Sequence, residues 1–279
     1  HWHPTPLTSM LVDGCLVAAR DVTAGGAVYN GSGVQGVGVV EVGDSLAAVE
    51  AVVFRARRAS LARLIRACRE GFHRSDTLRA HLRKAPKYGN DDPCADGFVA
   101  RAMELFSACL TGQRNTRGGG YAAGFYSVTA HHPFGAVVGA LPSGRLAGAP
   151  FSSGLSPADG LDRAGPTAAL RSVAGLPLHL ASNGVNFNLK LDPWVVAGPA
   201  GAERLQELID GGMAAGCMQM QVNVLDPQIL LEARDHPGRY PGLLVRVSGY
   251  SAYFDDLSPE MKQEIIDRTL HSSAHAHFC

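Results

Sequence analysis

The chain has 279 residues, of which 46% are hydrophobic and 18% charged, so it holds enough apolar material for one large domain or two small ones. Its 25 Lys and Arg residues balance 25 Asp and Glu residues, and the formal net charge is zero. A neutral chain creates no long-range field that attracts nucleic acid or an anionic membrane, so we expect neither as a partner and favour a small-molecule substrate.

The cysteines indicate the cellular compartment, and the first residues indicate where the sequence begins within its protein. Six scattered cysteines form no CxxC pair and show no regular spacing. They are typical of the reduced thiols of a cytoplasmic protein rather than of a disulfide framework. No run of about 18 apolar residues predicts a membrane span, and no signal peptide is recognisable. The abrupt opening HWHPTPLTSM suggests that the sequence starts inside a longer chain.

Glycine-rich loops and helices are predicted for the first part of the chain. Residues 23–43 combine many glycines with alternating Val, which is typical of loops joined to a short buried strand. Capping residues and apolar residues at helical spacing predict helices that begin at Asp44 and Ser60, and further helices over 76–82 and 96–110.

The remainder of the chain is predicted to mix strands, loops and helices. Residues 114–199 place Gly, Pro, Ser and Asn around short apolar pieces, which is typical of the strands and long loops of an α/β enzyme. The elements predicted after them are a helix over 202–213, a strand over 218–225, a helix over 227–234, a strand over 243–247 and a final helix over 258–268.

The segment RVSGYSAYF, residues 246–254, sets a glycine between an apolar strand and an apolar-aromatic stretch. The common interpretation of an isolated glycine is a tight turn that needs positive φ. The alternative is chemical, because an α-carbon without a side chain can flatten and share an unpaired electron with its amide nitrogen and carbonyl. The residues alone leave both interpretations of Gly249 open.

RVSGYSA followed by LSPEMKQEIIDRT resembles the C-terminal signature of the glycyl radical enzymes, the pyruvate formate-lyase and glycerol dehydratase superfamily. The segments DVTAGGAVYN, QGVG, APKYGNDD, FYSVTAHHPFG and GPTAALRSVA extend the resemblance over essentially the whole chain. It implies an α/β fold, the second half of a ten-stranded α/β barrel plus a C-terminal glycyl radical domain. We predict the barrel part over residues 1–150 and the radical domain over 151–279, with the radical loop at 246–254.

The resemblance assigns the radical to Gly249 and makes Arg246, Ser248 and Tyr250 its immediate frame. An activating enzyme with an iron-sulfur cluster, of the radical S-adenosylmethionine type, would install the radical after translation, and no bound cofactor is expected. Two frame residues also have ordinary interpretations, Tyr250 as a buried aromatic residue and Arg246 as a member of an ion pair.

The segment 124–130, expected as a strand, is the candidate for lining the substrate pocket. The resemblance places Tyr126 and Val128 beside the substrate, although both also suit an ordinary barrel strand. His131 and His132 would point to opposite sides of a strand, and no third ligand has suitable spacing, so we predict no metal site.

The family's thiyl cysteine lies in a Gly-Cys motif that is closely followed by a glutamate, and no cysteine of this chain fits that pattern. Cys15 follows Gly14, but the continuation LVAAR lacks an acidic residue. We therefore expect a fragment that holds the radical store and part of the pocket and that is inactive alone.

The segment LASNGVNFNLKLDP, residues 180–193, is closer to the dehydratase and lyase branch than to pyruvate formate-lyase. We predict an oxygen-sensitive enzyme of anaerobic metabolism that eliminates a group from a small hydroxylated substrate, homodimeric in its full-length form. Two alternatives stay open: acyl transfer of the formate C-acetyltransferase type, and a truncated, non-catalytic radical-domain protein.

Overall fold

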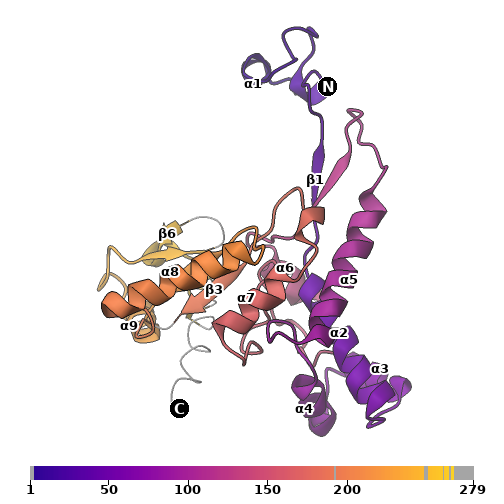
Figure 1. The fold of residues 1–279 in the computed structure, drawn as a ribbon, viewed down its shortest axis with the longest axis vertical. Coiled ribbons are helices and arrows are strands. Elements are labelled where there is room, and N and C mark those ends of the chain that lie inside the picture. The colour runs from indigo at the N-terminus through magenta and orange to yellow at the C-terminus, as the bar shows by residue number, and fades with distance from the viewer. Residues whose placement is uncertain (1–2, 192, 248–250, 260, 264, 267–279) are drawn as a thin grey trace.

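A computed structural model describes residues 3–191, 193–247, 251–259, 261–263 and 265–266. The N-terminal segment stands apart from the rest of the chain and is joined to it through β1 (Figure 1). The helices α2, α3, α4 and α5 gather on one side of the molecule, while α8, α9, β3 and β6 lie on the other (Figure 1).

The helices vary in length from one turn to about five turns. They are α1 (Pro6–Met10), α2 (Val39–Val49), α3 (Leu61–Arg69), α4 (Asp76–Lys84), α5 (Pro93–Leu110), α6 (His131–Val137), α7 (Pro166–Ala174), α8 (Gly198–Ala214) and α9 (Pro227–Asp235). A π-helical segment, Glu50–Arg55, continues α2.

The strands are short and form pairs. They are β1 (Ser32–Gln35), β2 (Tyr121–Gly124), β3 (Asn188–Leu191), β4 (Gln221–Val224), β5 (Leu244–Arg246) and β6 (Ser251–Tyr253). The β1–β2 and β3–β4 pairs are parallel, whereas β5 and β6 form an antiparallel pair. A parallel bridge between Phe125 and Val185 lies between the two parallel pairs. Parallel strands joined through helices are the pattern of an α/β barrel.

The largest core cluster joins segments that are far apart in the sequence. Tyr88, Val99, Phe125, Leu155 and Phe187 are each completely buried in it. These residues come from both sides of the boundary predicted at residue 150, and the division into two domains stays a prediction.

Helix α2 packs against α5 at unusually short range. A Cβ on Gly43 of α2 would lie 2.2 Å from Cγ2 of Val99 and 2.9 Å from its backbone nitrogen. Because real Cβ atoms do not approach other atoms so closely, the position admits glycine alone without movement of one helix.

Several predicted helices are confirmed with shifted ends. Ser60 caps α3, since its hydroxyl accepts a hydrogen bond from the Arg63 nitrogen at 3.2 Å. Helix α5 begins at Pro93 rather than at Asp96, because Asp92 caps it and proline is favoured in the first turn.

The structure corrects the predictions for the segments that form α2 and α7. Helix α2 begins at Val39, so Asp44 lies inside it as a buried residue and accepts a hydrogen bond from the Tyr88 nitrogen at 2.8 Å. Residues 166–174, expected among strands and loops, form α7, which buries Ala169, Leu170 and Val173 on one face and starts with proline.

Candidate functional site

The hairpin β5–β6 carries the predicted radical loop. Arg246 pairs with Ser251, and the chain leaves β5 through Val247, which is 2% exposed. The predicted site residues Ser248, Gly249 and Tyr250 lie outside the described residues. Of the segment 246–254, the structure therefore describes the residues on either side of the loop and their contacts.

The hairpin is anchored through an apolar cluster and through Arg246. Val245, Phe254 and Ile266 are buried in that cluster. Arg246 donates hydrogen bonds from Nε to Oε1 of Gln221 at 3.4 Å and from Nη1 to Oγ of Ser251 at 3.2 Å. The guanidinium thus ties the end of β5 both to β6 and to β4.

Backbone hydrogen bonds connect β4 to the segment that follows β2. The Gln221 nitrogen donates to the Phe187 carbonyl at 2.8 Å, and the Asn186 nitrogen donates to the Phe125 carbonyl at 3.2 Å. The hairpin and the predicted pocket residue Tyr126 therefore belong to one connected set of extended segments.

Tyr126 lies beyond the strand on which the sequence placed it. Strand β2 ends at Gly124, and Phe125 makes the last bridge. The Tyr126 hydroxyl oxygen accepts hydrogen bonds from Nε2 of Gln35 at 2.8 Å and from Nδ2 of Asn183 at 3.2 Å. Gln35 and Asn183 were not predicted as site residues, although both lie in segments, QGVG and LASNG, that carry the family resemblance.

Val128 follows in a strained conformation. Its φ is +52°, a region in which a β-branched residue is a clear outlier, and its side chain is about half exposed. Strain of this kind costs about 1–3 kcal/mol and is concentrated at functional sites. Tyr126 and Val128 therefore lie after β2, Val128 in a turn, rather than in a barrel strand.

The adjacent histidines start a helix instead of lying in a strand. His131 and His132 open α6, with ring centroids 4.6 Å apart, and Nδ1 of His131 is 2.9 Å from Oγ of Ser127. Among the described residues, no group of three or more His, Cys, Asp or Glu side chains is arranged to hold a metal ion.

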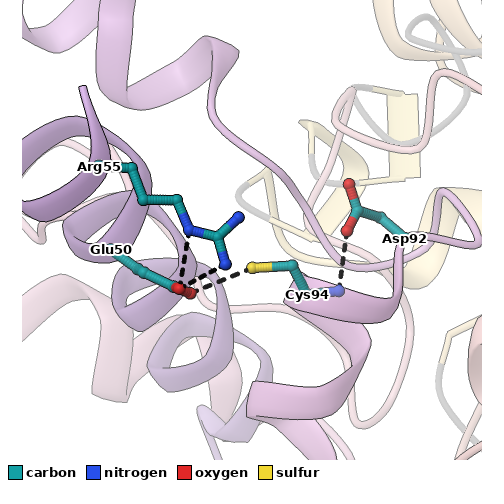
Figure 2. A network of polar contacts seen from close by, with 4 residues as sticks. All are labelled: Glu50, Arg55, Asp92 and Cys94. Atoms are coloured by element: carbon teal, nitrogen blue, oxygen red, sulfur yellow. Dashed lines mark hydrogen bonds and ion pairs between the residues drawn. The ribbon is translucent and has the colours of Figure 1, made fainter.

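Cys94 belongs to a polar network at the start of α5 (Figure 2). Its thiol donates to Oε2 of Glu50 at 3.3 Å, and Arg55 binds Oε1 of the same carboxylate at 2.6 Å. Burial and the Glu50 carboxylate raise the pKa of the Cys94 thiol. The setting is that of a protonated, hydrogen-bonded thiol that links α5 to the π-helical segment, rather than of an ionic nucleophile.

Carboxyl groups withdrawn from solvent lie on α2 and α5: Glu41 and Asp44 are buried, and Asp96 is partly buried. Burial raises the pKa of Asp44 to about 7 and that of Asp96 to about 6. Burial likewise raises the pKa of Glu41, whose Oε1 accepts a hydrogen bond from the Ser152 hydroxyl at 2.8 Å. Glu41 and Asp44 tie α2 to neighbouring loops, whereas Asp96 of α5 accepts a hydrogen bond from the Ser172 hydroxyl of α7 at 2.7 Å.

In the described part of the chain, no helix has the length and apolar character needed to cross a bilayer.

Two family models match the chain. The model described as pyruvate formate lyase-like matches residues 1–135, and the model described as glycine radical matches residues 151–255. The second match contains the segment 246–254 and the hairpin that carries it.

Relatives and solved structures agree with these matches. Trans-4-hydroxy-L-proline dehydratase of Clostridioides difficile is 37% identical over 95% of this chain and 34% of its own length. The glycerol-bound B12-independent glycerol dehydratase of Clostridium butyricum superposes with a TM-score of 0.92 at 39% identity, again over 95% of this chain and 34% of that one. A formate acetyltransferase of Haemophilus influenzae is 34% identical over 67% of this chain and 25% of its own length.

The chain spans about a third of the length of the dehydratases that it matches. Its parallel strand pairs correspond to part of their α/β barrel, and the glycine radical match implies a glycyl radical formed after translation. On the two family matches and these similarities, the chain belongs to the glycyl radical enzyme family.

Proposed function

We propose that this chain supplies the radical-bearing glycine and part of the substrate pocket of a glycyl radical dehydratase or lyase. The observation that carries the proposal is the glycine radical match over residues 151–255, which includes RVSGYSAYF. Gly249 is the radical site, with Arg246, Ser248 and Tyr250 as its frame.

The similarity to dehydratases over 95% of the chain supports elimination rather than acyl transfer. The substrate is a small hydroxylated molecule that lies beside Tyr126 and Val128. Because no cysteine of this chain has the expected motif, the thiyl cysteine comes from the remainder of the enzyme, and the chain does not turn over substrate alone.

The partner that starts the chemistry is an activating enzyme with an iron-sulfur cluster. It cleaves S-adenosylmethionine reductively, and the resulting deoxyadenosyl radical takes one hydrogen atom from the α-carbon of Gly249. The α-carbon radical of Gly249 then takes a hydrogen atom from the catalytic thiol, which restores the glycine C–H bond and leaves a thiyl radical on the cysteine. The full-length enzyme is proposed to be a cytoplasmic homodimer.

The test uses the full-length protein, its activase and S-adenosylmethionine under anaerobic conditions. We expect an electron paramagnetic resonance doublet from the remaining α-hydrogen, and backbone scission at Gly249 once air is admitted, identified by mass spectrometry. The Gly249→Ala variant is the control and should give neither signal. A folded wild-type protein with a competent activase and no doublet would contradict the proposal.

Substrate assays separate the two reaction types. Glycerol, 1,2-propanediol and trans-4-hydroxy-L-proline should be dehydrated or should compete for the site, whereas pyruvate with coenzyme A should give no acetyl transfer. Acetyl transfer from pyruvate would favour the formate acetyltransferase alternative.

A further inference from the structure

The Tyr126 hydroxyl differs from other tyrosine hydroxyls of the protein in its partners. The Tyr88 hydroxyl donates to the Leu155 carbonyl at 3.0 Å, and the Tyr240 hydroxyl donates to Oε2 of Glu232 at 2.7 Å. The Tyr126 oxygen instead accepts from Gln35 and Asn183, and no described residue accepts its proton. Since a phenolic oxygen has two lone pairs and both face donors, its remaining capacity is to donate.

Close packing against two glycines and a backbone hydrogen bond hold Asn183 in place. A Cβ on Gly33 of β1 would lie 2.3 Å from Nδ2 of Asn183, and one on Gly124 of β2 would lie 2.9 Å from the same atom. The Asn183 backbone nitrogen donates to the Ala123 carbonyl at 2.9 Å. Two glycines on paired strands therefore leave the space that the carboxamide fills.

Gln35 is fixed from the other side. It is the last residue of β1 and is paired with Gly124, so the register of the parallel pair sets its position. The two amide donors reach Tyr126 from separate segments of the chain. A tyrosine that merely filled space would not need two fixed donors on its oxygen.

We infer that Gln35 and Asn183 are positioning residues that hold Tyr126 as a hydrogen-bond donor to an oxygen atom of the substrate. The inference rests on the proposed function, since it takes Tyr126 as a pocket residue. Two N–H donors on the phenolic oxygen polarise its O–H bond and strengthen the bond that it donates. The site accordingly selects substrates that present a hydroxyl or carboxylate oxygen at this point.

The test replaces a donor by an acceptor of the same shape. In the full-length enzyme, Asn183→Asp and Gln35→Glu each offer a carboxylate to the Tyr126 proton, which turns away from the substrate. Binding of glycerol, 1,2-propanediol and trans-4-hydroxy-L-proline is measured by calorimetry on the non-activated enzyme, which needs no radical. We expect Kd to rise about tenfold or more for a compound that binds the wild-type protein.

Controls separate positioning from general damage. Gln228→Glu makes the same charge change at an exposed residue on α9 and should leave Kd unchanged. Tyr126→Phe should weaken binding by a similar factor, and Asn183→Asp should add little to it in the double variant, because both changes remove one hydrogen bond. After activation, the radical content of Asn183→Asp should equal that of wild type, with the loss appearing in KM more than in kcat.

Several outcomes would overturn the inference. They are unchanged Kd in Asn183→Asp and Gln35→Glu, a full additional loss from Asn183→Asp in the Tyr126→Phe background, or no binding of any of the three compounds to folded wild-type enzyme. Loss of the radical signal in wild type, with the effects on Kd intact, would instead overturn the proposed function and leave this inference standing.

Discussion

Nε of Arg246 on β5 lies 3.4 Å from Oε1 of Gln221 on β4, so one side chain links the proposed radical hairpin to the parallel strands. The same guanidinium also binds Ser251 across the hairpin. The position of the two hairpin strands depends on this double anchorage together with the apolar cluster that packs against them.

Arg246→Lys should lower the yield of the glycyl radical, because a lysine cannot make both hydrogen bonds from one planar group. Losing about 1 kcal/mol of anchorage would raise the fraction of misplaced hairpin about fivefold. Spin content per protomer and its decay under argon are the measurements. Arg239→Lys, which changes an exposed ion pair with Glu232, should leave both unchanged. Equal spin content and decay in Arg246→Lys and wild type would argue against the anchoring role.

Gly43→Ala should destabilise the protein by about 1–3 kcal/mol, because the added methyl would overlap Val99 across the α2–α5 contact. Gly97→Ala is a matched control on α5, where a Cβ meets no atom within 4 Å. That change should stabilise the helix by about 0.5–1 kcal/mol. Thermal or denaturant unfolding measures both, and a harmless Gly43→Ala would show that the helices separate easily.

Asp44 should make the protein less stable as the pH rises from about 4 to 7. Burial raises its folded-state pKa to about 7, so between the unfolded and the folded pKa the folded state keeps a proton that the unfolded state has lost. Asp96, with its pKa raised to about 6, acts in the same direction. The free energy of unfolding therefore falls across this range, and Asp44→Asn should flatten the fall.

Denaturant unfolding at pH 4, 5.5 and 7 measures this slope. Asp210→Asn, at an exposed position of α8, should leave it as in wild type. An identical slope in Asp44→Asn and wild type would mean that Asp44 ionises as freely in the folded as in the unfolded protein.

Val128→Asn should relieve backbone strain, because asparagine tolerates φ near +52° far better than valine does. We expect the free energy of unfolding to stay the same or to rise by about 1 kcal/mol. Substrate binding should weaken. Val137→Asn, an exposed valine at the end of α6, should bring no such gain. A clear loss of stability in Val128→Asn would show that the valine side chain makes important contacts.

Glu50→Gln should make Cys94 react faster with iodoacetamide near pH 8. Burial and the Glu50 charge both raise the pKa of the thiol, and the substitution removes the second cause. The exposed Cys109 serves as an internal reference, and peptide mass spectrometry follows both. A slower or unchanged rate at Cys94 would mean that access rather than charge limits the reaction.

Local signals predicted much of the helical part of the fold. Ser60 was recognised as a cap, and the helix that ends at Leu110 was found from its apolar spacing. The prediction at Asp44 is wrong because an acidic residue before apolar residues has the pattern of a helix cap. In the structure Asp44 is buried inside α2, where it accepts a hydrogen bond from the Tyr88 backbone nitrogen. Helix α7 was not predicted at all, because the glycine and proline residues around it are typical of loops.

The site shows the same division. The resemblance supplied Tyr126 and Val128, but their place beyond β2 depends on where the parallel ladder ends, which no local pattern encodes. Gln35 and Asn183 are 148 residues apart in the sequence. Both contact Tyr126 only because β1 pairs with β2 and the segment 183–186 is hydrogen-bonded to residues 123–125. Such a meeting requires the tertiary fold.

Strand β1 is paired with β2 on one side, and on the other no described strand is bonded to it. An open edge of this kind is a template on which a further strand can be laid down. Gln35 therefore lies on a strand edge that is unpaired among the described residues. A strand that paired with this edge would cover the side-chain amide that holds Tyr126. Because the register with β2 already sets the position of Gln35, such a strand would shield the two amide hydrogen bonds to Tyr126 from solvent without changing their geometry.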